Sequence, residues 1–566
     1  MPPQAYSSTL HDAVMPREDL GPDGGTAIIA GQPVGTVAQL SDYLMNGYWA
    51  WSGTVAHHWI SNTITYNLGN LDPSERDLAL GALSAWSEVA NIAFVQAEVA
   101  NINFNHNGNM TAFTSGNWIA SGQMISATVD ISSNWITSDG GANDGHTGVY
   151  SYGFQTYIHE IGHALGLGHQ GPYNGSATYG TDNVYANDSW QLSVMSYFPQ
   201  SYYNGGSYDY VITPQMADIA AVQSIYGASS TRAGNTVYGF NSNAGPLYDF
   251  SQYTGLGTPA LTIYDSGGSD TFDCSGYSQN QILDITPGAF CSVGGYIHNI
   301  GVFSTTLIEA AIGGTGSDTI IGNSAGNELI GGIGDDTIAG QGGNDIIDGG
   351  PGTDTVAYSG IRSQYQITQN SNGSFHISDL RPGAPEGTDD AWNIEFFQFA
   401  DRAVSTSDVF NHPPSSEPDL FAADHDFNGD GKADILLQHD SGLPVIWTMD
   451  GTTPTGAAVL PDAGPTWHVA AATDFSGDGK ADILLQHDSG LPVIWTMNDT
   501  TITGAAVLPD VGPTWHVAAA EDFSGDGKAD ILLQHDSGLP VIWTMDGTTV
   551  TAGVVLPNPG SDWDLL

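Results

Sequence analysis

The stretch HEIGHALGLGH, residues 159–169, has the spacing of a metal site. His159 and His163 are four residues apart, so on a helix both imidazoles lie on one face and can bind one ion. Gly166 is expected to end the helix, because glycine readily adopts the left-handed conformation of a sharp exit. The chain can then return His169 as a third ligand. Three imidazoles leave a tetrahedral Zn²⁺ one open position for water, as in catalytic zinc sites.

Glu160 follows the first histidine directly, so its carboxylate lies near the ion without ligating it. The whole stretch 159–169 matches the metzincin signature, and the chain resembles that clan of zinc endopeptidases. Downstream, SVMSYF at residues 193–198 narrows the resemblance, in particular to the serralysins. The resemblance makes Met195 the Met-turn residue, a hydrophobic floor under the imidazoles. It makes Tyr197 the tyrosine beside the zinc. Gln170 departs from the proline usual in that family.

The charge balance limits the possible partners. The 566 residues include 9 Lys and Arg against 61 Asp and Glu, a formal net charge of −52. Nucleic acid and anionic membranes are therefore poor partners. The acids either solvate the surface or bind Ca²⁺, which prefers oxygen ligands, and the motifs below favour calcium. No apolar run is long enough to span a membrane.

The length predicts three or four domains, and changes of composition suggest where they divide. The expected parts are an N-terminal arm or propeptide at 1–35, an α+β metzincin catalytic domain at 36–228, a calcium-binding β-roll domain at 229–410, a linker at 411–418 and an all-β repeat region at 419–566.

Within the catalytic domain, apolar periodicity predicts helices over 71–92, 152–167 and 213–227. Asp72 and Glu75 suit a capping box on the first helix. Thr213 and Pro214 suit the start of the last helix, and Gly227 suits its end.

Strands are predicted at 92–96 and 102–106 in the same domain. Residues 110–115 are a candidate sheet edge, and extended substrate could add to such an edge as a further strand. Four other histidines have no ligand spacing and are interpreted as structural or solvent-facing: His57, His58, His106 and His146.

The sequence at 229–245 and 263–277 resembles the beginning of the calcium-binding half of the serralysin chain. The resemblance implies several structural Ca²⁺ ions. It assigns as ligands the carbonyls of Arg232, Gly234 and Thr236, the carboxylates of Asp265 and Asp270, and also Gly267 and Glu309.

A nine-residue repeat follows in five copies over residues 313–357. Its glycines make turns, its sixth position is acidic and its eighth is apolar, which predicts a parallel β-roll with calcium between stacked turns. Asn327 replaces the acid in the second copy, so that site is weaker or absent. Residues 358–412 resemble the β segment that often closes such a roll. The predicted calcium-binding carboxylates are Asp318, Asp336, Asp345 and Asp354.

The last segment repeats DFNGDGKADILLQHDSGLPVIWTM, or a close copy, with a period of 48 residues. Its first half matches an EF-hand loop, but Leu437 stands where the final Glu would be, and ILLQ is predicted as a strand. The repeat resembles the FG-GAP or VCBS units of integrin-type β-propellers. The tentative calcium ligands are Asp426, Asn428, Asp430 and Asp434, then Asp474, Asp478 and Asp482, then Asp522, Asp526 and Asp530.

Three copies are too few for a closed propeller of four to eight blades. Three alternatives remain open: the blades are split, the three units form a small sheet assembly, or several chains associate. The repeated Trp447, Trp495 and Trp543 either belong to the core or line a sugar site.

The N-terminus lacks the basic and apolar parts of a secretory signal. Serralysin-like proteases leave the cell through a one-step exporter that reads the C-terminus, so secretion is expected. The terminal DWDLL resembles such a signal, but Trp563 also falls in register with the 48-residue repeat, which then simply stops. Cys274 and Cys291 either pair or are buried thiols.

Three functions compete. The first is a secreted zinc endopeptidase, with Glu160 as general base, Tyr197 stabilising the oxyanion, and proteins or peptides as substrates. The second is an adhesive protein that binds glycan or extracellular matrix through its repeats and carries a vestigial protease domain. The third, metal storage, does not explain Glu160 or Tyr197. Because every residue of the zinc site is present, the sequence favours the protease.

Overall fold

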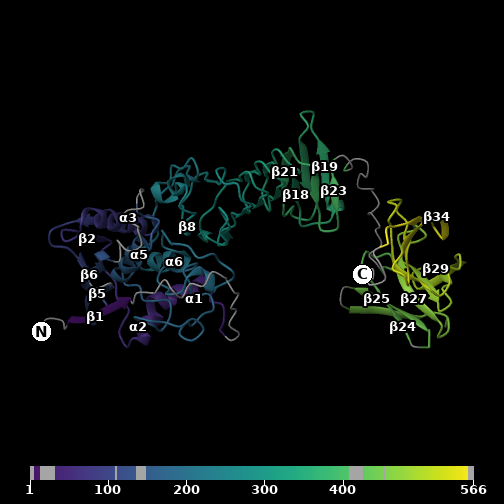
Figure 1. The fold of residues 1–566 in the computed structure, drawn as a ribbon, viewed down its shortest axis with the longest axis horizontal. Helices are drawn as coiled ribbons and strands as arrows, with labels where there is room; N and C mark the ends of the chain where they lie inside the picture. Colours follow the sequence, from purple (N-terminus) through teal and green to yellow (C-terminus); the bar gives the residue numbers. More distant parts are fainter. Residues whose placement is uncertain are drawn as a thin grey trace. The chain divides into compact units, whose positions relative to one another are not determined.

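The computed structural model describes residues 5–12, 32–108, 111–134, 148–406, 409, 425–439, 441–450 and 453–558. The chain forms two compact units, Met1–Pro413 and Pro414–Leu566, which are described separately (Figure 1). Three of the features discussed above lie outside the described residues: His146, the linker 411–418 and the terminal DWDLL. Among the described residues, no helix is both long enough and apolar enough to cross a membrane.

A six-stranded sheet forms one layer of the catalytic region. Its order is β1 (Ala5–Asp12), β5 (Ala112–Ile119), β6 (Met124–Ser132), β4 (Ile102–Asn107), β2 (Thr63–Asn67) and β3 (Ala93–Gln96). The pairs β1–β5 and β5–β6 are antiparallel, and the other pairs are parallel.

The prediction that residues 110–115 lie at an open sheet edge is wrong, because the N-terminal strand β1 covers that edge. All eight residues of β1 pair with β5, from Ala5 opposite Ile119 to Asp12 opposite Ala112. The N-terminal arm therefore adds a strand outside β5. This pairing joins segments about a hundred residues apart in the sequence, so no local pattern could reveal it.

Helices α3 (Pro73–Val89) and α5 (Tyr152–Ala164) pack against each other, and α5 also packs on β5 and β6 (Figure 1). The Trp86 indole N–H donates to the Ile158 carbonyl at 3.0 Å and joins the two helices. The predicted capping box of α3 is confirmed, with the Asp72 N–H donating to the Glu75 carboxylate at 2.8 Å. Short helical turns at α1 (Val37–Asp42), η2 (Tyr43–Gly47) and α2 (Tyr48–Trp51) lie between β1 and β2 in the chain.

Helix α6 (Met216–Tyr226) starts later than predicted. Gln215, not Thr213, is its N-cap, and it pairs reciprocally with Asp218. Thr213 is used elsewhere, because its hydroxyl accepts the N–H of Thr262 at 2.9 Å and so connects the helix start to strand β8 (Leu261–Ile263). The predicted end is confirmed, with Gly227 at φ +86°.

The region predicted to bind calcium contains two sheets of short, mainly parallel strands. One has the order β10 (Ile282–Asp284), β14 (Thr319–Ile321), β16 (Thr337–Ala339), β18 (Thr355–Ala357), β22 (Phe396–Gln398) and β23 (Ala403–Ser405). The other has the order β19 (Tyr365–Gln369), β20 (Phe375–Asp379), β21 (Thr388–Trp392), β17 (Ile346–Asp348), β15 (Glu328–Ile330), β13 (Ala310–Ile312), β9 (Thr271–Asp273) and β7 (Val237–Gly239). A third sheet contains β11 (Phe290–Cys291), β12 (Ile300–Val302) and β8 (Leu261–Ile263).

Successive nine-residue repeats alternate between the first two sheets, as a parallel β-roll requires. The eighth position of every copy is fully buried, which confirms the predicted core. The segment after residue 358 supplies β19 to β23 at the end of the roll, as expected. The buried residues are Ile320, Leu329, Ile338, Ile347 and Val356.

The second unit contains three antiparallel sheets, one for each 48-residue repeat, and ILLQ is a strand in all three. The first sheet contains β24 (Ile435–Gln438), β25 (Pro444–Asp450) and β26 (Thr453–Val459). The second contains β27 (Trp467–Thr473), β28 (Asp482–His487), β29 (Pro492–Asn498) and β30 (Thr501–Val507). The third contains β31 (Trp515–Glu521), β32 (Asp530–His535), β33 (Pro540–Asp546) and β34 (Thr549–Val555).

Candidate active site and metal centres

Helix α5 and the turn after it bring the three predicted zinc histidines together. Gly166 has φ +102°, and a Cβ there would lie 2.0 Å from the His57 carbonyl oxygen, so only glycine fits. The chain then returns His169, whose Nε2 lies 3.1 Å from that of His163. One nitrogen from each of the three histidines, including His159, lies within 4.8 Å of the other two.

A backbone carbonyl orients each of the three imidazoles. A carbonyl oxygen can only accept a hydrogen bond, so each Nδ1 carries the proton and, in the neutral ring, each Nε2 presents a lone pair. Lone pairs that converge in a buried space favour a cation between them, and imidazole nitrogen suits Zn²⁺. The residues present therefore fit zinc. The Nδ1-to-oxygen distances are 2.7 Å from His159 to Val194, 2.8 Å from His163 to Leu167 and 2.9 Å from His169 to Tyr173.

Glu160 is completely buried beside the first histidine. The Thr114 hydroxyl lies 2.7 Å from its Oε2 and 2.8 Å from its carbonyl oxygen. Because Thr114 is in β5, the strand next to the zinc helix fixes the position of this carboxylate. The sequence analysis missed Thr114, since nothing near it in the sequence points to residue 160.

The Met-turn lies under helix α5. Met195 is fully buried, and a Cβ on Gly162 would lie 2.5 Å from its sulfur, so glycine lets the methionine approach the helix. Asp218 of α6 holds the turn. It accepts the Ser193 hydroxyl at 2.6 Å and the Val194 N–H at 2.7 Å.

Asp218 therefore supports the peptide whose carbonyl orients His159, a role that the sequence analysis missed. Burial raises the pKa of Asp218 to about 6, and the hydrogen bonds that it accepts from Ser193, Gln215 and Val194 oppose this rise.

Tyr197 lies beside the histidine cluster. Its ring centroid is 4.6 Å from that of His169 and 6.3 Å from that of His159. Its hydroxyl accepts the Gly175 N–H at 3.1 Å. Tyr173, whose carbonyl orients His169, packs on Tyr197 with the ring centroids 4.7 Å apart. One tyrosine therefore connects a zinc histidine to the predicted oxyanion-binding residue.

The acids of the nine-residue repeat form a ladder through the roll. The Asp318 N–H donates to the Asp336 Oδ1 at 2.7 Å, and the Asp336 N–H donates to the Asp354 Oδ1 at 2.8 Å. On the other side, the Asn327 N–H donates to the Asp345 Oδ1 at 2.7 Å. The backbone thus fixes one oxygen of each receiving carboxylate.

The second oxygen of these carboxylates is buried without a hydrogen-bond partner in Asp336, Asp345 and Asp354. Burial and neighbouring acids raise the pKa of Asp336 to about 6 and that of Asp345 to about 8. Buried carboxyl oxygens that lack hydrogen-bond donors fit a hard cation such as Ca²⁺, which would favour their charged form. Asn327 differs, because its amide donates to nearby carbonyls such as that of Ile308 at 3.3 Å.

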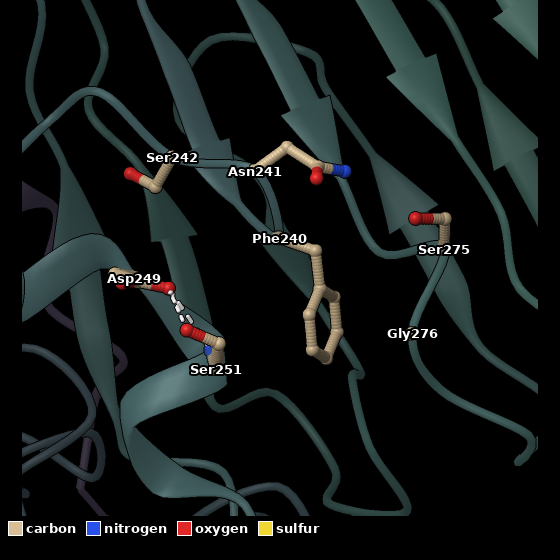
Figure 2. A pocket seen from close by; sticks show the side chains of 7 residues that line it. All are labelled: Phe240, Asn241, Ser242, Asp249, Ser251, Ser275 and Gly276. Atoms are coloured by element: carbon tan, nitrogen blue, oxygen red, sulfur yellow. Dashed lines mark hydrogen bonds between the residues drawn. The ribbon is translucent and has the colours of Figure 1, made fainter.

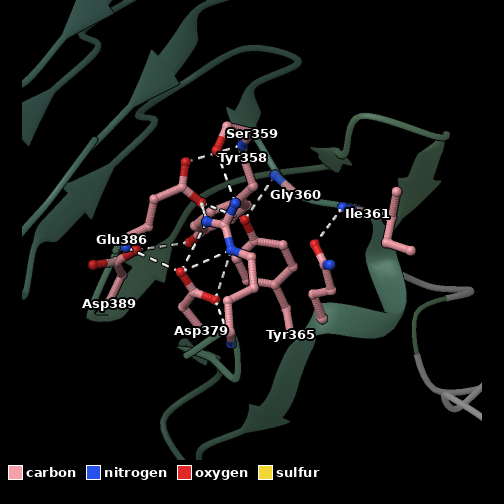
Figure 3. A network of polar contacts seen from close by, with 10 residues as sticks. Tyr358, Ser359, Gly360, Ile361, Tyr365, Asp379, Glu386 and Asp389 are labelled. Carbon is pink, nitrogen blue, oxygen red and sulfur yellow. Dashed lines mark hydrogen bonds and ion pairs between the residues drawn. The ribbon is translucent and has the colours of Figure 1, made fainter. Parts of the chain in front are cut away.

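Two residues that the sequence analysis missed end the ladders. The Asp345 N–H donates to Asp389 at 2.9 Å, and the Asp354 N–H donates to Glu395 at 2.8 Å. Figure 3 shows Asp389 within the polar network of the closing segment. There Tyr358 donates to Asp389 at 3.1 Å, and Arg381 joins two neighbouring acids, Asp379 and Glu386, each at 2.8 Å.

The structure also gathers most of the calcium ligands expected before the repeats. The Thr236 N–H donates to the Asp270 carboxylate at 2.8 Å, and the Asp270 N–H donates to Glu309 at 2.7 Å. The Gly267 N–H donates to Asp265 at 2.7 Å. Burial and the charges of Asp265 and Glu309 raise the pKa of Asp270 to about 6.

Gly234 and Arg232 complete this region. A Cβ on Gly268 would lie 2.7 Å from the Gly234 oxygen and 2.8 Å from an Asp270 oxygen, so these two expected ligands face the same glycine. The Arg232 side chain pairs with Glu88 of α3 at 3.0 Å. It thereby fastens this loop to the catalytic region.

The loops of the 48-residue repeats are organised by their own aspartates. In the first, Asp426 accepts the N–H groups of Gly429 and Gly431, each at 2.8 Å, and Asp434 accepts that of Met449 at 2.8 Å. The Asn428 side chain accepts the Asp430 N–H at 2.9 Å.

The second and third loops repeat this pattern. Asp474 and Asp522 accept the glycine N–H groups, and Asp482 and Asp530 accept those of Met497 and Met545. Burial and the charges of Asp474 and Asp478 raise the pKa of Asp482 to about 6. In the third loop, the Asp526 carboxylate accepts the Lys528 N–H at 3.0 Å.

The remaining histidines and cysteines have structural surroundings. His57 stacks on Trp118 with the ring centroids 4.1 Å apart, and burial lowers its pKa to about 4. His58 is exposed, and the His106 Nδ1 lies 2.9 Å from Glu75, which also caps α3. Cys274 and Cys291 are buried free thiols, which decides between the two alternatives above.

A surface pocket of about 580 Å³ lies in the first part of the region predicted to bind calcium (Figure 2). Phe240, Asn241 and Ser275 are among its lining residues, and none of the predicted site residues lines it. The Asp249 carboxylate accepts the Ser251 hydroxyl at 2.6 Å and the Gln252 amide at 2.9 Å. Its charged group is therefore already paired within the loop.

Comparisons with known proteins agree with this architecture. The family model of the peptidase M10 serralysin C-terminal region matches residues 227–384, and that of the FG-GAP-like repeat matches residues 426–485 and 474–533.

Similar curated proteins are metalloproteases. Metalloprotease AprA of Pseudomonas entomophila (strain L48) is 37% identical over 332 residues, 54% of this chain and 68% of the relative. Metallopeptidase AprA of Pseudomonas marginalis is 34% identical over 364 residues, 57% of this chain and 73% of the relative. Serralysin G of Dickeya chrysanthemi is 39% identical over 268 residues, 44% of this chain and 53% of the relative.

Three converging imidazoles beside a buried carboxylate, together with these relatives, place the chain in the class of zinc metalloendopeptidases. Within that class it belongs to the serralysin family, and it carries FG-GAP-like repeats after the serralysin C-terminal region.

Replacing Asp218 with alanine should weaken zinc binding by about 10- to 100-fold, because the peptide that orients His159 loses its support. Competition with a chromophoric chelator measures this affinity. Ser224→Ala, an exposed change on the same helix, is the matched control. Equal zinc affinity in the two variants would show that Asp218 does not position the ligand.

Proposed function

We propose that this chain is a secreted zinc endopeptidase whose metzincin-type catalytic domain occupies residues 36–228. The observation that carries the proposal is the set of three Nδ1-to-carbonyl hydrogen bonds, which aims three imidazole lone pairs at one point beside Glu160. Zinc at that point would lower the pKa of a bound water and polarise the scissile carbonyl.

In this proposal the residues of the chain do the proton transfer and the positioning. Glu160 accepts a proton from the attacking water and returns it to the leaving amine. Thr114 holds the Glu160 carboxylate at 2.7 Å, so the base is oriented before substrate binds. Tyr197 donates a hydrogen bond to the oxyanion, and Met195 supports the histidines from below.

Replacing Glu160 with alanine should reduce turnover on the order of 10²- to 10⁴-fold, because general-base catalysis is lost. The three histidines remain, so zinc content should stay near one ion per chain. Casein hydrolysis and elemental analysis give the two readouts, with Glu98→Ala as the control at an exposed acid. Near-normal hydrolysis by a zinc-loaded Glu160→Ala protein would exclude this role.

We also propose that residues 229–410 form a β-roll stabilised by several calcium ions. The unpartnered buried oxygens of Asp336, Asp345 and Asp354 support this. Without cations, these charges crowd, and glycine-rich turns lose much entropy on ordering. Binding would then be coupled to folding.

In chelator, residues 313–357 should exchange their amide hydrogens rapidly, and millimolar calcium should protect them. Replacing Asp336 with alanine should raise the calcium midpoint about tenfold, because a carboxylate ligand is lost. Asp335→Ala changes the adjacent exposed acid and should have a smaller effect. Equal protection with and without calcium would contradict the proposal.

The arm at residues 1–35 is proposed to be a prosegment that blocks the active site. Strand β1 pairs with β5, the strand to which extended substrate would add, and its Leu10 lies opposite Thr114. A peptide cannot add to an edge that is already paired.

The uncut chain should therefore cleave a short fluorogenic peptide more slowly than the chain from which residues 1–31 have been removed. Cutting the same preparation with a protease within residues 1–31 provides a second comparison of the rate before and after the cut. Equal kcat/KM values before and after removal of the arm would contradict the proposal that the arm blocks the active site.

Two further proposals concern transport and the repeats. Export in one step without an N-terminal signal would agree with the calcium-dependent roll, because the chain could cross the exporter unfolded. Secretion that depends on the general secretory pathway would oppose this route.

The repeats at 419–566, with tentative calcium loops and propeller-like sheets, could hold the enzyme on glycan or matrix. Equal retention of the full chain and a repeat-deleted chain on such a matrix would oppose that role.

A further inference from the structure

The three sheets of the repeat region stack through the same two faces each time. We define the leading face by Ile435, Leu437 and Trp447 of the first sheet and their equivalents 48 and 96 residues later. We define the trailing face by Phe427, Ile446 and Leu460 and their equivalents in the same way. The leading face of the second sheet shares an apolar cluster with the trailing face of the first, and the third sheet contacts the second likewise.

Polar contacts repeat at both junctions. The Ala481 N–H donates to the Asp426 carbonyl at 2.7 Å, and the Ala529 N–H donates to the Asp474 carbonyl at 3.0 Å. The Gln438 amide donates to the Trp467 carbonyl at 2.7 Å, as that of Gln486 does to Trp515 at 2.9 Å. The junction is therefore a defined interface that the chain forms twice.

Among the residues that the structure describes, the leading face is open at the first sheet. Leu437 is 41% exposed, whereas its equivalents Leu485 and Leu533 are each 1% exposed. Ile435 is 38% exposed, whereas Ile483 and Ile531 are fully buried, although the surrounding sequence is the same.

In the described part of the chain, up to residue 558, the trailing face is open at the third sheet. Phe523 is 40% exposed, whereas Phe427 and Phe475 are fully buried. The array therefore ends in two different apolar faces, and each is the complement of the other. Apolar side chains left open at positions that are otherwise buried indicate a surface that binds another protein.

We propose that the two open faces bind each other between two copies of this chain. The leading face of one copy would stack on the trailing face of the second, and the remaining two faces would meet in the same way. Two such head-to-tail contacts close a ring of six repeat sheets, within the four to eight of known propellers. The same repeat residues that bury the internal junctions would then bury the ends.

Light scattering during size-exclusion chromatography of the full chain, at micromolar concentration in calcium, tests this assembly. The wild-type chain should elute with twice the monomer mass. Leu437→Glu places a charge in the leading face and should give a monomer. Val507→Glu is the matched control, because Val459, Val507 and Val555 are 68%, 69% and 65% exposed and stacking does not cover this position. It should remain a dimer.

Mixing tests the pairing of unlike faces. Leu437→Glu and Phe523→Lys chains should each be monomeric alone, and their mixture should form a dimer, because one junction is then wild type and the other joins opposite charges. Circular dichroism of each variant checks that it is folded. A monomeric wild-type chain, dimers that persist in Leu437→Glu, open polymers, or a mixture that stays monomeric would each overturn the proposal.

Discussion

The catalytic centre depends on three hydrogen bonds from histidine Nδ1 atoms to backbone carbonyls. They fix the tautomer of each ring and aim the other nitrogen inward. The carbonyls belong to the Met-turn, the exit of α5 and the following loop, so these segments must keep their positions. Gly166 permits the exit through φ +102°, and Asp218 holds the Met-turn.

In the β-roll, backbone hydrogen bonds also orient the predicted metal ligands, but these ligands are acidic carboxyl groups instead of neutral imidazoles. Backbone N–H groups bind one oxygen of each aspartate and leave the other buried. In both regions backbone hydrogen bonds hold one atom of each predicted ligand and leave another buried nitrogen or oxygen for an ion, and a buried polar atom without a partner favours ion binding. Asp389 and Glu395 extend the ladders into the closing segment, which links that segment to the proposed calcium sites.

Local periodic patterns predicted most of this architecture. The histidine spacing, the capping box of α3 and the buried eighth position of each nonapeptide all depend on neighbours within a few residues. Contacts between distant segments were missed. Thr114 reaches Glu160 only after β5 lies on α5, and β1 pairs with its neighbour β5 although the two strands are about a hundred residues apart in the sequence. Thr213 suits a helix cap locally, but it bonds to Thr262, and Gln215 takes its place.

The central claim is that the three carbonyl-oriented imidazoles hold one catalytic zinc ion. X-ray absorption at the zinc edge, on the full chain purified in calcium, tests it most directly. We expect one zinc per chain with three imidazole nitrogens at about 2.0–2.1 Å and at least one light-atom ligand in the open position. A chain without tightly bound zinc, or zinc with fewer than three imidazole ligands, would contradict it.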